Sequence, residues 1–188
     1  YLVWLIGKRS ITDRVSLLER SSLRLAEGDL TVRVADLVSG GEVGNLGSTF
    51  DYMANQLAQR EEALRRSEDN LQQIMDSSPA VIFVKDLDGR YLFINSLYER
   101  LFHVSKKTIV GKTDFDIFPA KTAAAFRDAD LKALGNNMPI EATETVPQDD
   151  GEHTYLALKF PLYDSNNRPY AVCGMATDIT ERNRLEEK

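Results

Sequence analysis

The chain has few of the residues that bind metals or form disulfides. Its 188 residues include one cysteine, Cys173, and two histidines, His103 and His153. A single cysteine excludes a disulfide within the chain and fits a reducing compartment. Two histidines far apart in the sequence do not have the spacing of a metal-binding motif. The sequence therefore predicts neither a metal site nor a disulfide framework.

Positive charge is also scarce. The sequence holds 23 lysines and arginines against 29 aspartates and glutamates, which gives a formal net charge of -6. Nucleic-acid binding requires basic side chains collected along one face, where they neutralise phosphates. We therefore predict no nucleic-acid partner.

Long hydrophobic runs are missing as well. The apolar run Tyr1–Ile6 has six residues, whereas a membrane-spanning helix takes about 20. Tyrosine and tryptophan close to Lys8 and Arg9 are nevertheless typical of the cytoplasmic end of a membrane helix. We interpret residues 1–9 as the end of a transmembrane helix, which places the rest of the chain on the cytoplasmic side of the inner membrane. The alternative is a short buried strand.

Catalytic motifs are absent from the sequence. It has no histidine phosphoacceptor motif, no glycine set for ATP and no nucleophile paired with a base. Gly40-Gly41-Glu42 matches the start of the GGDEF signature of diguanylate cyclases, but Val43 and Gly44 do not continue it. We predict that this chain is a sensor and transmitter rather than an enzyme.

The sequence does contain a long heptad stripe. Its positions, alternately three and four residues apart, are apolar except at Arg60 and Ser67. The apolar positions are Val43, Leu46, Phe50, Met53, Leu57, Leu64, Leu71 and Ile74. Such a stripe buries one side of a helix against a parallel partner helix, so we predict a coiled-coil homodimer. Arg60 and Ser67 are either tolerated polar positions or a weak point at which two packings interconvert.

A second apolar heptad helix precedes this one. It ends at Gly28, and residues 29–41 lead to Glu42, whose carboxylate suits the start of the next helix. Connections between bundled helices usually take about two to eight residues. We therefore predict that this longer connector runs back along the first helix and makes the two helices parallel.

Three motifs in this region resemble the HAMP linker of membrane receptors, kinases and cyclases. They are Leu25–Leu30, Glu42–Leu46 and Phe50–Met53. Arg14 and Gly41 depart from the family's usual residues. The resemblance implies a parallel four-helix bundle formed by two chains at residues 10–62, followed by a coiled-coil connecting helix at 63–77. We assign signal coupling to six residues here: Gly28, Glu42, Phe50, Met53, Arg60 and Ser67.

After the heptad helix the pattern changes to short strands. Two strands at 80–84 and 91–95 flank a turn, a helical stretch follows, and three strands come last, at 140–146, 153–163 and 169–177. This order predicts an antiparallel α+β sheet with helices on one face.

The strand order and two motifs of this module, Gly111–Asp116 and Asp178–Thr180, resemble the PAS family. The resemblance implies a five-stranded antiparallel sheet at residues 78–180 that encloses a sensing pocket or a plain core. It also implies an output helix that starts within residues 181–188 and leads to a C-terminal effector domain.

The resemblance also bears on cofactors. Flavin photosensors of the family need a reactive cysteine in the region 97–103, and haem-binding members need a histidine in the helix 120–136; both are missing. We identify no cofactor and expect neither flavin nor haem. We expect Cys173 to be a small buried hydrophobe and His103 to be a surface or capping residue. A small organic ligand in the pocket remains an open alternative, with four polar candidates to bind it: Asn95, Asp114, Thr143 and Lys159.

The last motif joins the sheet to the output helix. Asp178 and Glu181 have the spacing of a capping box. We predict that Asp178, together with Thr180, couples the last strand to this helix.

Taken together, the sequence predicts a multi-module chain: an all-α parallel HAMP bundle joined by a long helix to an α+β PAS domain. We predict that this chain is the front end of a membrane-bound bacterial sensor histidine kinase of a two-component system. The alternatives are the front end of a diguanylate cyclase or phosphodiesterase, and a ligand-binding module without enzyme output.

Overall fold

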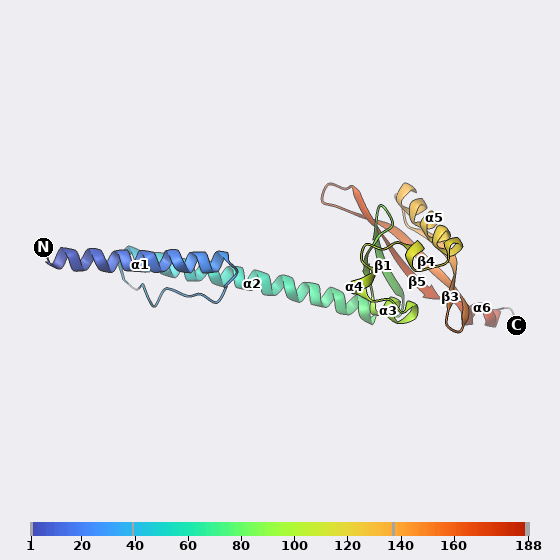
Figure 1. Ribbon diagram of the computed structural model, residues 1–188, viewed down its shortest axis with the longest axis horizontal. Helices are drawn as coiled ribbons and strands as arrows, with labels where there is room; N and C mark the ends of the chain where they lie inside the picture. The colour runs from blue at the N-terminus through green and yellow to red at the C-terminus, as the bar shows by residue number, and fades with distance from the viewer. Residues whose placement is uncertain (1, 39, 137, 187–188) are drawn as a thin grey trace. The chain divides into compact units, whose positions relative to one another are not determined.

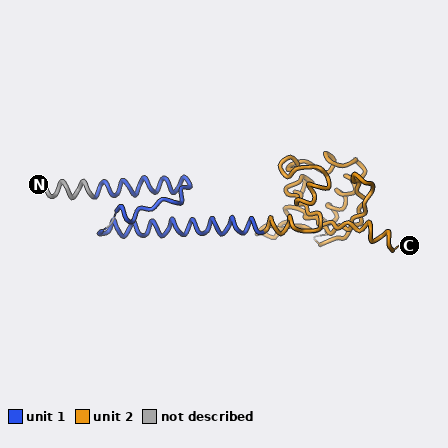
Figure 2. Tube along the Cα trace, turned by 90° about the horizontal axis from the view of Figure 1, so that it is seen from below, with its two compact units in different colours: residues 1–70 blue, residues 71–188 orange. Residues whose placement is uncertain are grey.

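The computed structural model describes residues 2–38, 40–136 and 138–186, with side chains from residue 11 onward. It divides into two compact units, residues 1–70 and 71–188 (Figure 2). The side chains on which the predicted membrane exit at residues 1–9 depends lie outside this description. Of the helices within the described ranges, none is both long and apolar enough to span a bilayer.

The first unit consists of two helices and a connector. Helix α1 spans Leu2–Ala26, and helix α2 spans Gly41–Ser77, so that its last turns belong to the second unit. Gly28 follows α1 with a φ of +97°, a conformation that favours glycine. The connector runs back along α1, and α1 and α2 therefore run in the same direction, as predicted (Figure 2).

A small apolar core joins the two helices and the connector. Its buried members are Leu18, Val32, Val34, Val38, Phe50 and Ala54. The Asp51 carboxylate holds the connector in place, because it accepts hydrogen bonds from the backbone N–H groups of Val34 (2.7 Å) and Ala35 (3.1 Å). Gly47 lies so close to Val38 that any side chain there would overlap with it.

The second unit is a five-stranded antiparallel sheet with helices on one face (Figure 1). The strands, in the spatial order β2-β1-β5-β4-β3, are β1 (Val81–Asp86), β2 (Tyr91–Ile94), β3 (Ile140–Gln148), β4 (Gly151–Tyr163) and β5 (Pro169–Asp178). The helices are α3 (Ser96–Phe102), α4 (Lys106–Ile109), the 3-10 turn η1 (Asp114–Asp116), α5 (Ala120–Asn136) and α6 (Thr180–Glu186). The predicted antiparallel α+β sheet is confirmed.

The core of this unit lies between the inner face of the sheet and helices α3 and α5. Aromatic rings dominate it: Tyr98, Phe102, Phe118 and Phe126 follow one another in edge-to-face contacts, with ring centroids 4.7 to 5.2 Å apart. Such contacts add to the free energy gained by burying the rings.

Strand β1 is longer than predicted at its carboxyl end. The sequence pattern placed the end at Val84, ahead of the predicted turn at 86–89. In the structure Lys85 is buried inside the unit. Asp86 closes the β1–β2 turn by accepting hydrogen bonds from the backbone N–H groups of Asp88 and Arg90. The two charges therefore belong to the strand, because each meets a partner.

Candidate functional site

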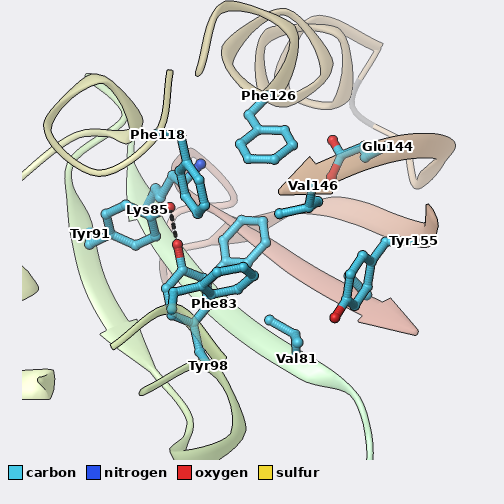
Figure 3. A pocket seen from close by; sticks show the side chains of 12 residues that line it. Val81, Phe83, Lys85, Tyr91, Tyr98, Phe118, Phe126, Glu144, Val146 and Tyr155 are labelled. Atoms are coloured by element: carbon cyan, nitrogen blue, oxygen red, sulfur yellow. Dashed lines mark hydrogen bonds between the residues drawn. The ribbon is translucent and has the colours of Figure 1, made fainter. Parts of the chain in front are cut away.

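A cavity lies between the inner face of the sheet and the helices of the second unit (Figure 3). It is lined mainly by apolar and aromatic side chains, among them Phe83, Tyr91, Tyr98, Phe118 and Phe126. The volume open to the centre of a water molecule is about 30 Å³. This is room for one or two water molecules, so the interior is nearly filled in this conformation.

Five charged side chains are buried beside this cavity. They come from five different elements and are Lys85 of β1, Asp114 of η1, Asp130 of α5, Glu144 of β3 and Lys159 of β4. We call them the interior charge cluster. Four of the five side chains are at most 2% exposed, and Glu144 is 10% exposed.

Asp130 lies at the centre of the cluster and joins the two lysines. Its Oδ2 is 3.0 Å from Lys85 Nζ, and its Oδ1 is 2.9 Å from Lys159 Nζ. Lys85 also binds Asp114 Oδ2 at 2.6 Å, and Lys159 lies 2.7 Å from Glu144 Oε1. Lys159 further donates to the backbone carbonyl of Phe126 at 3.2 Å. The cluster thereby ties the sheet to the helical face.

Not all of these contacts are well-aligned hydrogen bonds. Asp130 Oδ1 and Glu144 Oε1 each lie within ion-pair distance of Lys159 but have no hydrogen bond of good geometry. Lys85 Nζ lies 4.7 Å from the ring centroid of Phe83 and 4.9 Å from that of Tyr91. The rings therefore stabilise part of its charge by cation–π interaction.

The cluster contains three carboxylates and two ammonium groups, so one negative charge is in excess when all are ionised. Burial raises the pKa of Glu144, and the attraction of Lys159 offsets only part of this effect. Burial alone lowers the pKa of Lys159, but Asp130 and Glu144 raise it above its ordinary value. Lys159 therefore stays charged, and burial makes the carboxylate of Glu144 easier to protonate than an exposed glutamate.

Two tyrosine hydroxyls extend the cluster. Tyr91 donates to Asp114 Oδ1 at 2.6 Å, and the Tyr98 hydroxyl lies 2.6 Å from that of Tyr91 (Figure 3). Since the Tyr91 proton is directed to Asp114, Tyr98 is the donor in the second bond. Burial raises the pKa of both tyrosines, so both remain neutral hydroxyls.

The structure brings together only two of the four predicted ligand-binding residues. Asp114 and Lys159 both belong to the interior charge cluster, where Asp130 and Lys85 bridge them. Thr143 is exposed and lines a surface groove between α5 and β3.

Asn95, the fourth candidate, lies outside the cavity lining and performs a structural role. Its Oδ1 accepts hydrogen bonds from the backbone N–H groups of Ile82 and Tyr98 at 3.0 and 3.1 Å. Its Nδ2 donates to the carbonyls of Met75 (3.0 Å) and Ala80 (2.9 Å). This one amide caps α3 and fastens the last turn of α2 to β1.

Sequence reasoning missed five polar residues of the site: Lys85, Tyr91, Tyr98, Asp130 and Glu144. A signal existed only for Lys85, which follows the apolar run Val81–Val84 and ends a strand pattern. Nothing in the sequence distinguishes Asp130 and Glu144 from ordinary surface charges, because their partners lie far away in the sequence.

A second polar contact holds the last turn of α2 to the helices of this unit. Lys106 Nζ lies 2.8 Å from Asp76 Oδ1, and Ser96 N donates to the same oxygen at 2.7 Å. Although burial raises the pKa of Asp76, hydrogen bonds from Lys106, Gln72 and Ser96 lower it well below its usual range. Asp76 therefore stays ionised at the entry of the unit.

The exit of the unit has its own polar contacts, centred on Asp178. Asp178 Oδ1 accepts from Thr180 N at 2.9 Å, and its Oδ2 lies 2.6 Å from His153 Nδ1. The predicted capping box is not what forms here, since Asp178 bonds to Thr180, two residues ahead, while Glu181 lies 3.7 Å from Arg184. The short Asp178–Thr180 turn replaces it, because Thr180 already begins the helix.

The remaining predicted residues take these positions. Glu42 is exposed in the first turn of α2, Phe50 is buried in the core of the first unit, and Met53, Arg60 and Ser67 are exposed along α2. Their part in signal coupling stays a prediction.

The two side chains discussed as cofactor ligands have ordinary surroundings. Cys173 is buried, and burial raises its pKa to about 11, as expected of a small hydrophobe. His103 is exposed at the carboxyl end of α3 in the left-handed conformation, with Nε2 2.7 Å from Asp149 Oδ2. The prediction of a surface or capping residue is confirmed.

Family models match both parts of the chain. A model of the PAS fold matches residues 75–184, and a model of the HAMP domain matches residues 8–59. The first of these covers more than half of the chain.

Two of the curated relatives are named as enzymes, one a histidine kinase and the other a diguanylate cyclase. The methanogenesis regulatory histidine kinase FilI of Methanothrix harundinacea is 29% identical over 144 residues, which is 77% of this chain and 16% of the relative. A diguanylate cyclase of Vibrio cholerae is 27% identical over 118 residues, which is 61% of this chain and 37% of the relative. This chain therefore spans only a minor part of either relative.

Among solved structures, the fold is similar to that of VqmA in the crystal structure of a Vibrio cholera VqmA–ligand–DNA complex. The TM-score is 0.54 and the identity 26%, over 58% of this chain and 51% of that one.

Proposed function

Because the chain belongs to the PAS fold family and has a HAMP domain before its PAS domain, we propose that it relays signals in a membrane-bound bacterial sensor histidine kinase. In this proposal a conformational change passes from the inner membrane through the HAMP and PAS domains to the effector of the full-length protein. On this proposal the chain lies on the cytoplasmic side of the membrane and transmits the signal, while the catalytic step belongs to the effector.

One observation carries this proposal: a single helix, α2, belongs to both domains. Phe50 and Ala54 of α2 are buried in the core of the first unit, and Met75 and Asp76 of the same helix bind residues of the second unit. A rotation or shift of α2 therefore acts on the entry contacts of the PAS domain, since Asp76 and Asn95 hold its last turn.

We further propose that the chain works as a homodimer through parallel helices. Six apolar residues of the heptad stripe stay between 46% and 68% exposed: Leu46, Met53, Leu57, Leu64, Leu71 and Ile74. An exposed apolar stripe of this kind is stabilised by pairing with an identical stripe. The polar Arg60 and Ser67 interrupt it and, on this proposal, keep the pairing weak enough to switch.

Cysteine crosslinking tests the pairing directly. In a Cys173→Ala background, Leu57→Cys and Leu71→Cys are expected to form disulfide-linked dimers under mild oxidation. Gln59→Cys, an exposed position of the same helix outside the stripe, is the matched control and is expected to crosslink far less. Single protomers in light scattering at every concentration, with no crosslink at either stripe position, would contradict the dimer.

A diguanylate cyclase front end is the second candidate. The Vibrio cholerae relative supports it, because that diguanylate cyclase is similar to 61% of this chain. Incubating the full-length protein with labelled ATP and, separately, with GTP distinguishes the two. Labelled phosphohistidine supports the kinase, and a cyclic dinucleotide supports the cyclase. If neither product forms, both proposals fail.

The PAS interior bears on the third alternative, a ligand binder without enzyme output. A cavity of about 30 Å³ does not hold an organic molecule unless side chains at its rim, such as Phe102 and Phe118, move. The relay is therefore the function that this conformation supports best. Native mass spectrometry of the purified protein checks this: a stoichiometric organic molecule would favour the ligand binder.

A further inference from the structure

His153 lies between two carboxylates at the exit of the PAS domain. Its Nδ1 is 2.6 Å from Asp178 Oδ2 at the end of β5, and its Nε2 is 2.9 Å from Asp150 Oδ1 in the turn before β4. Ionised carboxylates only accept hydrogen bonds, and a neutral imidazole has one N–H. Both contacts are therefore satisfied only when the ring carries two protons, because a neutral ring turns a lone pair toward one of the carboxylates.

The carboxylate that His153 holds is also the one that starts the exit helix. Asp178 Oδ1 accepts from Thr180 N at 2.9 Å, and Thr180 Oγ1 accepts from Thr154 N at 2.8 Å. Ile179 N donates to the Thr154 carbonyl at 2.8 Å. The first residues of α6 are thus tied to the strand that carries the histidine, with Asp178 as the shared link.

The surroundings of the ring leave these two carboxylates as its main electrostatic partners among the described residues. Its side chain is 17% exposed, while those of Asp178 and Asp150 are 38% and 75% exposed. Across the sheet on β3 lies Val146, which is uncharged, and beside it on β4 is Tyr155, whose pKa is raised chiefly by burial. The ring is shielded but can exchange protons with water.

These contacts also fix the direction of titration. The hydrogen bond to Asp178, and less strongly that to Asp150, raises the pKa of His153 above its ordinary 6.5. A group with a raised pKa stabilises the folded contacts below its unfolded pKa, and this stabilisation is lost as the pH rises through its folded pKa. The state in which His153 bonds both Asp178 and Asp150 is therefore populated at pH values below the folded pKa of His153.

We propose that His153 is a proton-operated latch: the protonated ring bonds Asp178 and Asp150 at once and tightens the start of α6 on β4, whereas loss of the proton gives up one of these two bonds and loosens it. This inference deepens the proposed relay, since it makes the coupling between the PAS domain and its exit helix depend on pH. Binding of a proton then strengthens the latch, and a rise in pH loosens it.

Nuclear magnetic resonance on the isotope-labelled 188-residue chain tests the latch. The His153 ring is expected to titrate with a midpoint above pH 6.5, and the amide proton of Thr180 to follow the same midpoint. Asp150→Asn is expected to lower both midpoints together. Asp149→Asn, the adjacent residue that pairs with His103 instead, is the matched control and is expected to change neither.

Three results would overturn the latch: a His153 midpoint at or below 6.5, a Thr180 amide that does not follow it, or the same transition at Thr180 in His153→Gln. The proposed relay is tested separately by the output of the full-length protein. If Thr180 follows His153 while output does not change with pH, the latch is retained and its part in signalling is overturned.

Discussion

The two units differ in what they bury and what they expose. Among the described residues, the first unit buries apolar side chains and one serine, Ser21, but no charged side chain, and it leaves the apolar stripe of α2 in contact with water. The second unit buries five charges and two tyrosine hydroxyls in a nearly filled interior. If the proposed dimer forms, the first unit gains stability by association, whereas the second holds its own shape through contacts that tolerate few alternatives.

The largest expected effect on the free energy of unfolding comes from removing Asp130, at the centre of the interior charge cluster. Asp130→Ala leaves Lys85 and Lys159 without their shared partner in the interior, and breaking a buried pair in this way costs about 3–5 kcal/mol. Urea unfolding of the chain measures this loss. Asp128→Ala is the matched control on the same helix, where the pair with Lys132 is exposed and contributes at most about 1 kcal/mol. Equal losses in the two variants would contradict the role given to the cluster.

For Leu64, in the exposed stripe, we expect a loss of pairing between chains rather than a loss of folding stability. Leu64→Ala is expected to leave the fold of each protomer unchanged and to weaken pairing by roughly 3 kcal/mol per dimer, about 100-fold in the dissociation constant. Sedimentation equilibrium measures the dissociation constant. Leu37→Ala removes a leucine that is 65% exposed on the connector and is expected to change nothing. If both variants dimerise like the parent, the stripe is not the interface.

A further test concerns Arg60 and Ser67, the two polar residues that interrupt the stripe. Arg60→Leu combined with Ser67→Leu completes the apolar stripe and is expected to strengthen pairing by about 2 kcal/mol. Because the two packings would no longer be close in free energy, output of the full-length protein should stay in one state. An unchanged response to the signal would show that the two residues are merely tolerated.

The smallest effect on stability is expected at Asp178. Asp178→Ala removes the contact to Thr180 N, which is worth about 1 kcal/mol, and the link to His153. We predict that output is uncoupled while the melting temperature falls by only a few degrees. A large drop in the melting temperature would leave Asp178 with a structural role alone.

The fold was accessible from the sequence because it follows local patterns. The heptad spacing of α2, the breaker at Gly28 and the turn between the first two strands each depend on residues close in sequence. The end of β1 was misplaced by two residues, and the only local sign that Lys85 continues the strand is the apolar run Val81–Val84 before it.

The interior charge cluster could be predicted only in part for the same reason. Asp114 and Lys159 stood out as polar residues in apolar or motif surroundings. Asp130 lies in a helix rich in charged residues, and Glu144 alternates with polar neighbours on an edge strand. Their burial results from five separate elements meeting in space, which no local pattern encodes.

Asn95 shows how narrow the chemical tolerance at the entry of the PAS domain is. Its amide serves two donors through oxygen and two carbonyls through nitrogen. Aspartate has the same outline but replaces that nitrogen with an acceptor, so the Met75 and Ala80 carbonyls would face a like partial charge. This part of the attachment of α2 thus depends on the identity of one atom rather than on volume, and a residue of equal size is no substitute.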